Sequence, residues 1–247
     1  MTAAAPVRRI AMWSGPRNLS TALMRAFGNR ADAWVVDEPF YGVFLDWTGK
    51  DHPGRDEVLA RMPRDWRAIA EGLVSERQDG RTLFYQKHMA HHLLPGMGRD
   101  WIDRVENAFL IRDPRAMIAS YVRSREEVAA DDLGYAVLAE LFARERARTG
   151  RVPAVVDAAD ILADPGRTLA ALCTALDIPF DPAMLSWAPG PRASDGVWGA
   201  HWYRSLWAST GFAPARTEAA VVPDALAPLA AACEPHYRML HAHRITG

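Results

Sequence analysis

Near the start of the chain, an apolar run is followed by a polar turn and then by a helix-forming stretch. The run is 10–13, and the helix-like stretch is 22–27. A strand, turn and helix in this order present the unpaired N-terminal amides of the helix, and the positive end of its dipole, to an anion. The segment therefore predicts an anion-binding turn, and the residues expected to bind the anion are Arg17, Asn18, Leu19, Ser20, Thr21 and Ala22.

Short β-branched or aromatic runs alternate with longer helical stretches along the rest of the chain. This alternation is typical of an α/β protein, a P-loop-type parallel β-sheet flanked by helices. The expected strands are 8–13, 33–36, 82–86, 108–111 and 153–156. The expected helices are 20–27, 66–77, 114–125, 135–148, 165–176 and a last one within 224–243.

The length of 247 residues suits one domain over 1–247. Two stretches, 41–64 and 187–214, lack clear periodicity and are expected to be loop-rich insertions. The second is rich in tryptophan, which argues against disorder.

Composition excludes several classes of protein. A formal net charge of −1 argues against a general nucleic-acid binder, and no apolar run is long enough to span a bilayer. The start of the chain lacks a signal-peptide hydrophobic segment. Cys173 and Cys233 have no metal-type spacing, so we expect reduced core thiols in a cytoplasmic protein with no membrane or nucleic-acid partner; the oligomeric state is open.

The turn departs from the loop of nucleoside triphosphatases. That loop needs a Gly-Lys pair for the terminal phosphates, but counting from Gly15 these positions hold Ser20 and Thr21. An ordinary strand-to-helix turn with a hydroxyl cap is the simpler alternative. An arginine three residues upstream of a Ser-Thr pair instead resembles the 5′-phosphosulfate loop of sulfotransferases, which use 3′-phosphoadenosine 5′-phosphosulfate (PAPS).

A second anion motif follows the fourth expected strand. The strand breaks at Arg112, a helix begins near Pro114, and Ser120 lies eight residues after Arg112. This resembles the 3′-phosphate motif of sulfotransferases; a strand-end arginine paired with an acid is the structural alternative. An acidic stretch at 157–165 also matches the family, and the resemblance runs from Ile10 to about Leu185. It implies a sulfotransferase-like fold, PAPS as donor and 3′-phosphoadenosine 5′-phosphate (PAP) as product.

Glu38 is one candidate for the general base. It lies just after the second strand, where open α/β sheets place their ligands. Its spacing from Arg17 resembles that of the catalytic glutamate of tyrosylprotein sulfotransferases. Apolar neighbours would raise the pKa of its carboxyl group toward the working pH. A capping or salt-bridging glutamate is the alternative.

His88 is the competing base. Cytosolic sulfotransferases carry Lys-x-His at this place, but here Gln86 occupies the lysine position, so Lys87 would have to act on the bridging oxygen. His88, His91 and His92 have the spacing of one helix face and could in principle bind zinc. No accompanying Cys or His-Glu pattern supports a metal, so an active-site or capping histidine is favoured and no metal is predicted.

Residues 189–192 and 195–198 lie where the family has a basic loop that closes on the 3′-phosphate. Arg192 is the candidate there, and Trp198 or Trp202 could stack on adenine. The resemblance thus predicts sulfuryl transfer from PAPS to a hydroxyl or amine of an unidentified small molecule. The alternatives are an ATP-dependent P-loop kinase or nucleotidase and a non-catalytic nucleotide-binding protein on the same fold.

Overall fold

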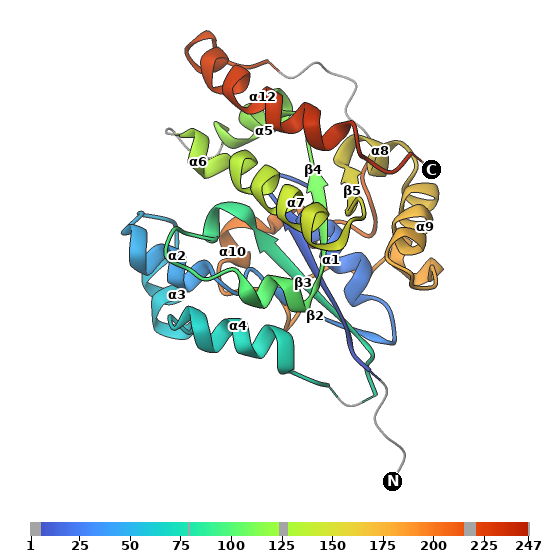
Figure 1. Cartoon of the computed structure of the whole chain (residues 1–247). Coiled ribbons are helices and arrows are strands. Elements are labelled where there is room, and N and C mark those ends of the chain that lie inside the picture. The colour runs from blue at the N-terminus through green and yellow to red at the C-terminus, as the bar shows by residue number, and fades with distance from the viewer. Residues whose placement is uncertain (1–5, 79, 124–127, 215–220, 247) are drawn as a thin grey trace.

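A single five-stranded sheet, with all its strands parallel, forms the centre of the molecule (Figure 1). A computed structural model of the chain describes residues 6–78, 80–123, 128–214 and 221–246. The strand order is β2-β3-β1-β4-β5. The strands are β1 (Arg8–Ser14), β2 (Ala33–Asp37), β3 (Leu83–Met89), β4 (Glu106–Ile111) and β5 (Ala154–Asp157).

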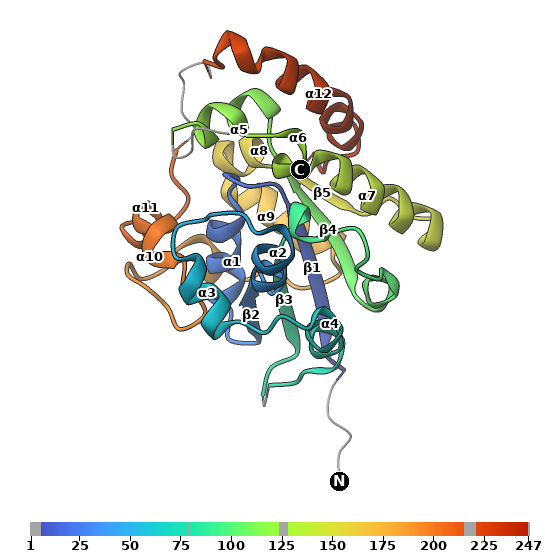
Figure 2. The same ribbon diagram turned by 90° about the vertical axis from the view of Figure 1, so that its left-hand side faces the viewer.

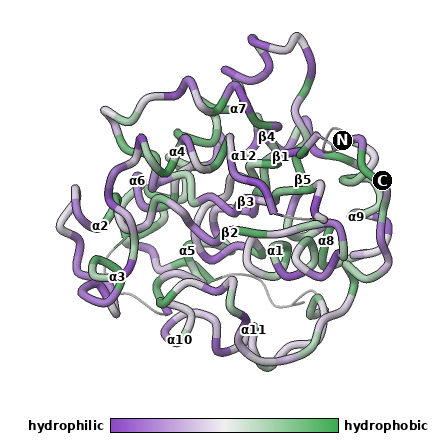
Figure 3. The backbone as a smooth tube through the Cα atoms, turned by 90° about the horizontal axis from the view of Figure 1, so that it is seen from below, coloured by the Kyte–Doolittle hydropathy of each residue, from purple (hydrophilic) through white to green (hydrophobic). Residues whose placement is uncertain are grey.

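Helices cover both faces of this sheet, and the two layers are seen edge-on in Figure 2. One apolar core contains Leu23 and Phe27 of α1 (Ser20–Gly28), Ile161 of α8 (Ala158–Ala163) and Leu169 of α9 (Pro165–Ala175). On the other face, α4 (Trp66–Ser75) and α7 (Tyr135–Thr149) pack on a core that includes Trp13. Figure 3 shows hydrophobic stretches along β2 and α1 in the middle of the molecule.

Further helices complete the described part of the chain. The α-helices are α2 (Tyr41–Thr48), α3 (Arg55–Arg61), α5 (Pro114–Tyr121), α6 (Ala130–Leu133), α10 (Gly199–Trp202), α11 (Arg204–Trp207) and α12 (Ala227–His241). The 3-10 helices are η1 (Ala90–His92), η2 (Asp100–Arg104), η3 (Pro182–Leu185) and η4 (Asp224–Leu226). No helix in the described part of the chain is long and apolar enough to cross a membrane.

The predicted fold class is confirmed, since each expected strand and helix overlaps an observed one. The expected end of the third helix, Arg125, falls among residues 124–127, outside the described part of the chain.

The expected loop at 41–64 contains two helices, α2 and α3. Residues 41–45 are all buried, and this packing against η1 and α3 stabilises a short helix that lacks the length to show a clear period. Stretch 187–214 is mostly irregular, with two four-residue helices, α10 and α11.

Parallel strands bring their carboxyl ends to one edge of the sheet. The turn after β1, the segment after β2, the end of β3 and the segment after β4 therefore meet there, although they are far apart in the sequence.

Gly15 lies where other elements approach the turn closely. A Cβ atom at this position would lie 2.6 Å from the carbonyl oxygen of Leu133 and 2.9 Å from the terminal methyl of Met117. Only glycine fits here without displacing backbone.

We predict that Gly15→Ala lowers the free energy of unfolding by about 1–3 kcal/mol, because the new methyl group collides with backbone that cannot rotate away. Urea unfolding measures the effect. The control is Gly166→Ala in α9, where the new Cβ meets its nearest atom at 3.7 Å, an ordinary contact. Equal stability of the two variants would contradict the prediction.

Candidate functional site

The conformation of the turn between β1 and α1 is fixed by hydrogen bonds of its own side chains. The Nδ2 of Asn18 donates to the carbonyl oxygen of Leu110 (3.0 Å), and its Oδ1 accepts from the amide of Leu19 (2.8 Å). Arg17 has a positive φ of 52°, a left-handed conformation that is uncommon for residues with a side chain. No side chain caps the start of α1, so its first amides have no capping partner and are available to an anion.

Two arginines lie beside this turn. Arg17 donates from Nε to the Oγ of Ser120 (3.4 Å), and Arg112 donates from Nη1 to the carbonyl oxygen of Arg17 (2.5 Å). Among the described residues, neither guanidinium forms an ion pair with a carboxylate. Burial lowers the pKa of both groups, yet arginine stays protonated at neutral pH. The turn, Arg112 and Ser120 are thus brought together as predicted, and they form a positive site that favours an anion.

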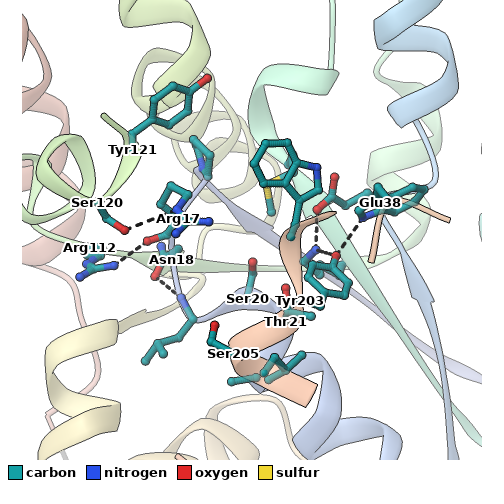
Figure 4. A pocket seen from close by; sticks show the side chains of 18 of the residues that line it. Arg17, Asn18, Ser20, Thr21, Glu38, Arg112, Ser120, Tyr121, Tyr203 and Ser205 are labelled. Carbon is teal, nitrogen blue, oxygen red and sulfur yellow. Dashed lines mark hydrogen bonds and ion pairs between the residues drawn. The ribbon is translucent and has the colours of Figure 1, made fainter. Parts of the chain in front are cut away.

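A cavity of about 390 Å³ extends from these arginines to the ends of β2 and β3. Figure 4 shows how its walls are divided. Arg17, Asn18, Arg112 and Ser120 lie at one end, Glu38 and Tyr203 at the other, and Ser20 and Thr21 between them. We call the end with Arg17 and Arg112 the arginine end, and the end with Glu38 the carboxylate end. Leu19 and Ala22 also line the cavity.

The carboxylate end is built on the register of two strands. Asp37 of β2 lies directly opposite Lys87 of β3, so their side chains share one face of the sheet. The ammonium group of Lys87, with only 1% of the side chain exposed, donates to Asp37 Oδ1 (2.7 Å), Glu38 Oε1 (2.5 Å) and the hydroxyl of Tyr203 (2.9 Å). These three bonds use all its donors, so Lys87 holds Glu38 in place and has no free N–H for a bridging oxygen.

Glu38 is the carboxylate that faces the cavity. Its φ of 44° turns the chain sharply after β2 and directs the residue into the site. Burial raises the pKa of its carboxyl group, while the positive charge of Lys87 opposes this rise and the negative charge of Asp37 adds to it. A raised pKa suits a general base that works near neutral pH.

His88 lies outside the cavity, which corrects its prediction as a base. Adjacent strand residues point to opposite faces, so His88 turns away where Lys87 turns in. Its ring stacks on Trp13, its register partner in β1, at 4.4 Å between centroids. Burial lowers the pKa of the imidazole to about 3.

The expected helical face of histidines is also wrong, because His88 lies within β3 and only His91 and His92 lie in the 3-10 helix η1. No cluster of metal-ligating residues occurs within the described ranges.

Arg192 is likewise placed away from the cavity. It donates from Nη2 to Asn29 Oδ1 (3.2 Å), just past the C-terminal end of α1, whereas the anion turn lies at the other end of that helix. Trp198 and Trp202 line the cavity. Trp198 is buried and donates to the hydroxyl of Tyr203 (3.0 Å).

Sequence patterns did not single out several residues that line the carboxylate end. They are Tyr41, His52, Met89 and Tyr203, of which Tyr203 reaches Lys87 from the irregular stretch 187–214. No local motif marks them, since their proximity depends on tertiary packing. His91 and His92, which sequence spacing had grouped as possible zinc ligands, line the same wall.

Comparison with known proteins agrees with this geometry. Residues 8–244 match the family model described as a sulfotransferase domain, and the chain belongs to that family. It is also 36% identical to branched-chain-amino-acid aminotransferase-like protein 1 of Arabidopsis thaliana and 34% identical to protein 2, over 94% of the chain. The chain spans only 41% of the length of these two relatives.

Solved structures share the fold. The sulfotransferase domain of the Synechococcus PCC 7002 olefin synthase aligns with a TM-score of 0.57 at 16% identity, over 96% of this chain and 97% of that one. A sulfotransferase from Alicyclobacillus acidocaldarius aligns with a TM-score of 0.54 at 15% identity, over 98% of both chains.

The burial of His88 predicts that the folding stability of the protein falls in acid. In the unfolded chain its imidazole takes up a proton as the pH falls through about 6.5, but in the folded protein only near pH 3. The folding stability it supports is therefore present above pH 6.5 and is lost as the pH falls, by about 1 kcal/mol per pH unit. Urea unfolding at pH 7.5 and 5.5 should show a smaller loss in His88→Phe than in the wild type.

Phenylalanine suits this ring-lined position, because Phe40 and Trp101 also pack near His88. A control variant at the exposed His201, His201→Gln, should keep the wild-type loss. An unchanged loss in His88→Phe would show that this imidazole does not titrate as described.

Proposed function

We propose that the chain transfers a sulfuryl group from PAPS to a hydroxyl or amine of a small molecule, with PAP as the second product. The observation that carries this proposal is that one cavity has two chemically different ends. One end holds two arginines that have no carboxylate partner among the described residues, and the other holds a carboxyl group with a raised pKa. One end suits an anionic donor and the other can accept a proton.

The residues of the arginine end fit the donor. The first amides of α1, with Arg17, Ser20 and Thr21, would hold the 5′-phosphosulfate, since amides, hydroxyls and a guanidinium all donate to anionic oxygens. Arg112 and Ser120 would hold the 3′-phosphate. When bound, PAPS supplies the sulfuryl group.

The carboxylate end acts on the acceptor. Glu38 accepts the proton of the acceptor's nucleophile, while Lys87 keeps the carboxylate oriented. Donors fixed around the opposite end stabilise negative charge as it moves toward the phosphate. The nearby wall of rings, which includes Tyr41 and Trp202, favours an acceptor with an apolar or ring-bearing body.

We predict that Arg17→Ala and Arg112→Ala each weaken PAP binding about 10- to 100-fold, because each variant removes a charge-assisted hydrogen bond from a buried anion site. Isothermal titration measures the affinity. The matched control is Arg192→Ala, an arginine outside the cavity, which should bind PAP as the wild type does. Tight binding of Mg·ATP with no binding of PAP would contradict the proposed donor.

We predict that Glu38→Gln lowers sulfuryl transfer about 100-fold or more and leaves PAP affinity unchanged, because the amide cannot take the proton. Transfer of labelled sulfate from PAPS into the small molecules of a cell extract is the measurement. The control is Glu140→Gln, at a glutamate on the outer side of α7 that pairs only with Arg99 among the described residues. Wild-type transfer by Glu38→Gln would exclude this carboxylate as the base.

A further inference from the structure

The hydroxyl of Tyr203 joins stretch 187–214 to both carboxylates of the site. We propose that Tyr203 is a positioning residue that, through its hydrogen bonds to Asp37 and Lys87, limits how strongly Glu38 holds a proton. The inference rests on the proposed function, because it specifies how the proton affinity of that base is set. Tyr203 lies at the carboxylate end of the cavity, close to Glu38 (Figure 4).

Every hydrogen-bonding position of the Tyr203 hydroxyl is used. It donates to Asp37 Oδ2 (2.7 Å) and accepts from Lys87 Nζ (2.9 Å) and from Trp198 Nε1 (3.0 Å). A phenol has one donor and two acceptor positions, so this hydroxyl is saturated. Tyr203 is buried, which makes each of these bonds costly to break.

The two neighbouring carboxylates receive different numbers of donors. Asp37 Oδ1 accepts from Lys87, and Asp37 Oδ2 accepts from both Tyr203 and the amide of Gly196 (3.3 Å). Both oxygens of Asp37 are covered, and the residue does not line the cavity. Glu38 accepts from Lys87 at Oε1, its carboxylate also interacts with the hydroxyl of Tyr203, and the residue lines the cavity. The geometry therefore leaves Glu38 Oε2 as the oxygen that can meet an acceptor.

Tyr203 also affects how the ammonium group of Lys87 is shared between Asp37 and Glu38. By donating to Asp37, its hydroxyl offsets part of that carboxylate's negative charge, so Lys87 can remain between Asp37 and Glu38. Without the hydroxyl, the cluster keeps its charges but loses a donor. Its affinity for a proton then rises, and the proton is taken up at Glu38, where solvent reaches.

The charged and titratable groups around Glu38 come from β2, β3, η1 and the residue between α10 and α11. His92 Nδ1 lies 3.9 Å from Glu38 Oε2. Burial, together with repulsion from neighbouring histidines and from Lys87, lowers the pKa of His92, so this ring is neutral. The full set facing Glu38 is Asp37 from β2, Lys87 from β3, His92 from η1 and Tyr203 after α10, with His52 and His91 behind His92.

The same stretch is also fixed to the C-terminal end of α1, the end away from the anion turn. Arg25 of α1 pairs with Asp195 at 2.6 Å, and both side chains are at least 96% buried. Further along, Ser205, Ser209 and Phe212 line the cavity. Stretch 187–214 is thus tied to α1 by one buried ion pair and to the base by Tyr203.

Tyr203→Phe tests the inference, because phenylalanine keeps the ring and removes only the hydroxyl. We expect the titration midpoint of the Glu38 carboxyl to rise by about one pH unit. The midpoint is measured by NMR on protein with ¹³C-labelled glutamate carboxyls, with the Glu38 signal assigned from its absence in Glu38→Gln. The acidic limb of the pH–rate profile for transfer should move by the same amount.

The matched control is Tyr237→Phe, which removes a similar tyrosine–aspartate hydrogen bond, from Tyr237 to Asp157 (2.9 Å), away from the cavity. This variant should leave the Glu38 midpoint unchanged even if it lowers stability. If Tyr203→Phe does not fold, Trp198→Phe removes the indole donor to the same hydroxyl and should shift the midpoint in the same direction.

An unchanged or lower midpoint, or an equal shift in Tyr237→Phe, would overturn the role of Tyr203. These outcomes are separate from failure of the proposed function. Absence of PAP binding to the wild-type protein would count against the donor site, whereas the NMR titration needs neither donor nor acceptor.

Discussion

The ammonium group of Lys87 is the interaction on which the site depends. A cation this deeply buried is tolerated only when anions and hydrogen bonds surround it, and removing one partner of such a pair costs about 3–5 kcal/mol. Its requirement for partners draws together the end of β2, the middle of the sheet and the segment after α10. The direction of Glu38 is a consequence of neutralising this charge.

The cavity is divided by charge. At the arginine end, positive charge is balanced by no carboxylate among the described residues, while at the carboxylate end two carboxylates share one lysine. A transfer reaction needs this separation, because negative charge must be stabilised on the departing group while a proton is removed from the attacking group. The strand order produces the separation, since the turn after β1 and the end of β2 lie on either side of β3 at one edge of the sheet.

Features encoded by neighbouring residues could be predicted from the sequence. Features that depend on contacts between distant segments could not. Apolar runs predicted the sheet, and the turn after β1 predicted residues that line the cavity, because both patterns are encoded within a few residues. The choice between Lys87 and His88 could have been made from the alternation of side chains along a strand. It was missed because β3 continues three residues beyond the expected end, so that both residues lie in the strand. Tyr203 and Arg192 could not be placed, because nothing in the sequence says which end of α1 each part of 187–214 will meet.

Stretch 187–214 contributes Trp198, Tyr203 and Phe212 to the wall of the cavity, so any ligands that bind there together contact one shared piece of chain. A ligand that orders this piece pays part of the entropy that the second ligand would otherwise lose. Thermodynamic linkage then requires the effect to be reciprocal: by whatever factor one ligand tightens the binding of a second, the second tightens the binding of the first. Two ligands of this cavity would therefore bind cooperatively, whichever of them binds first.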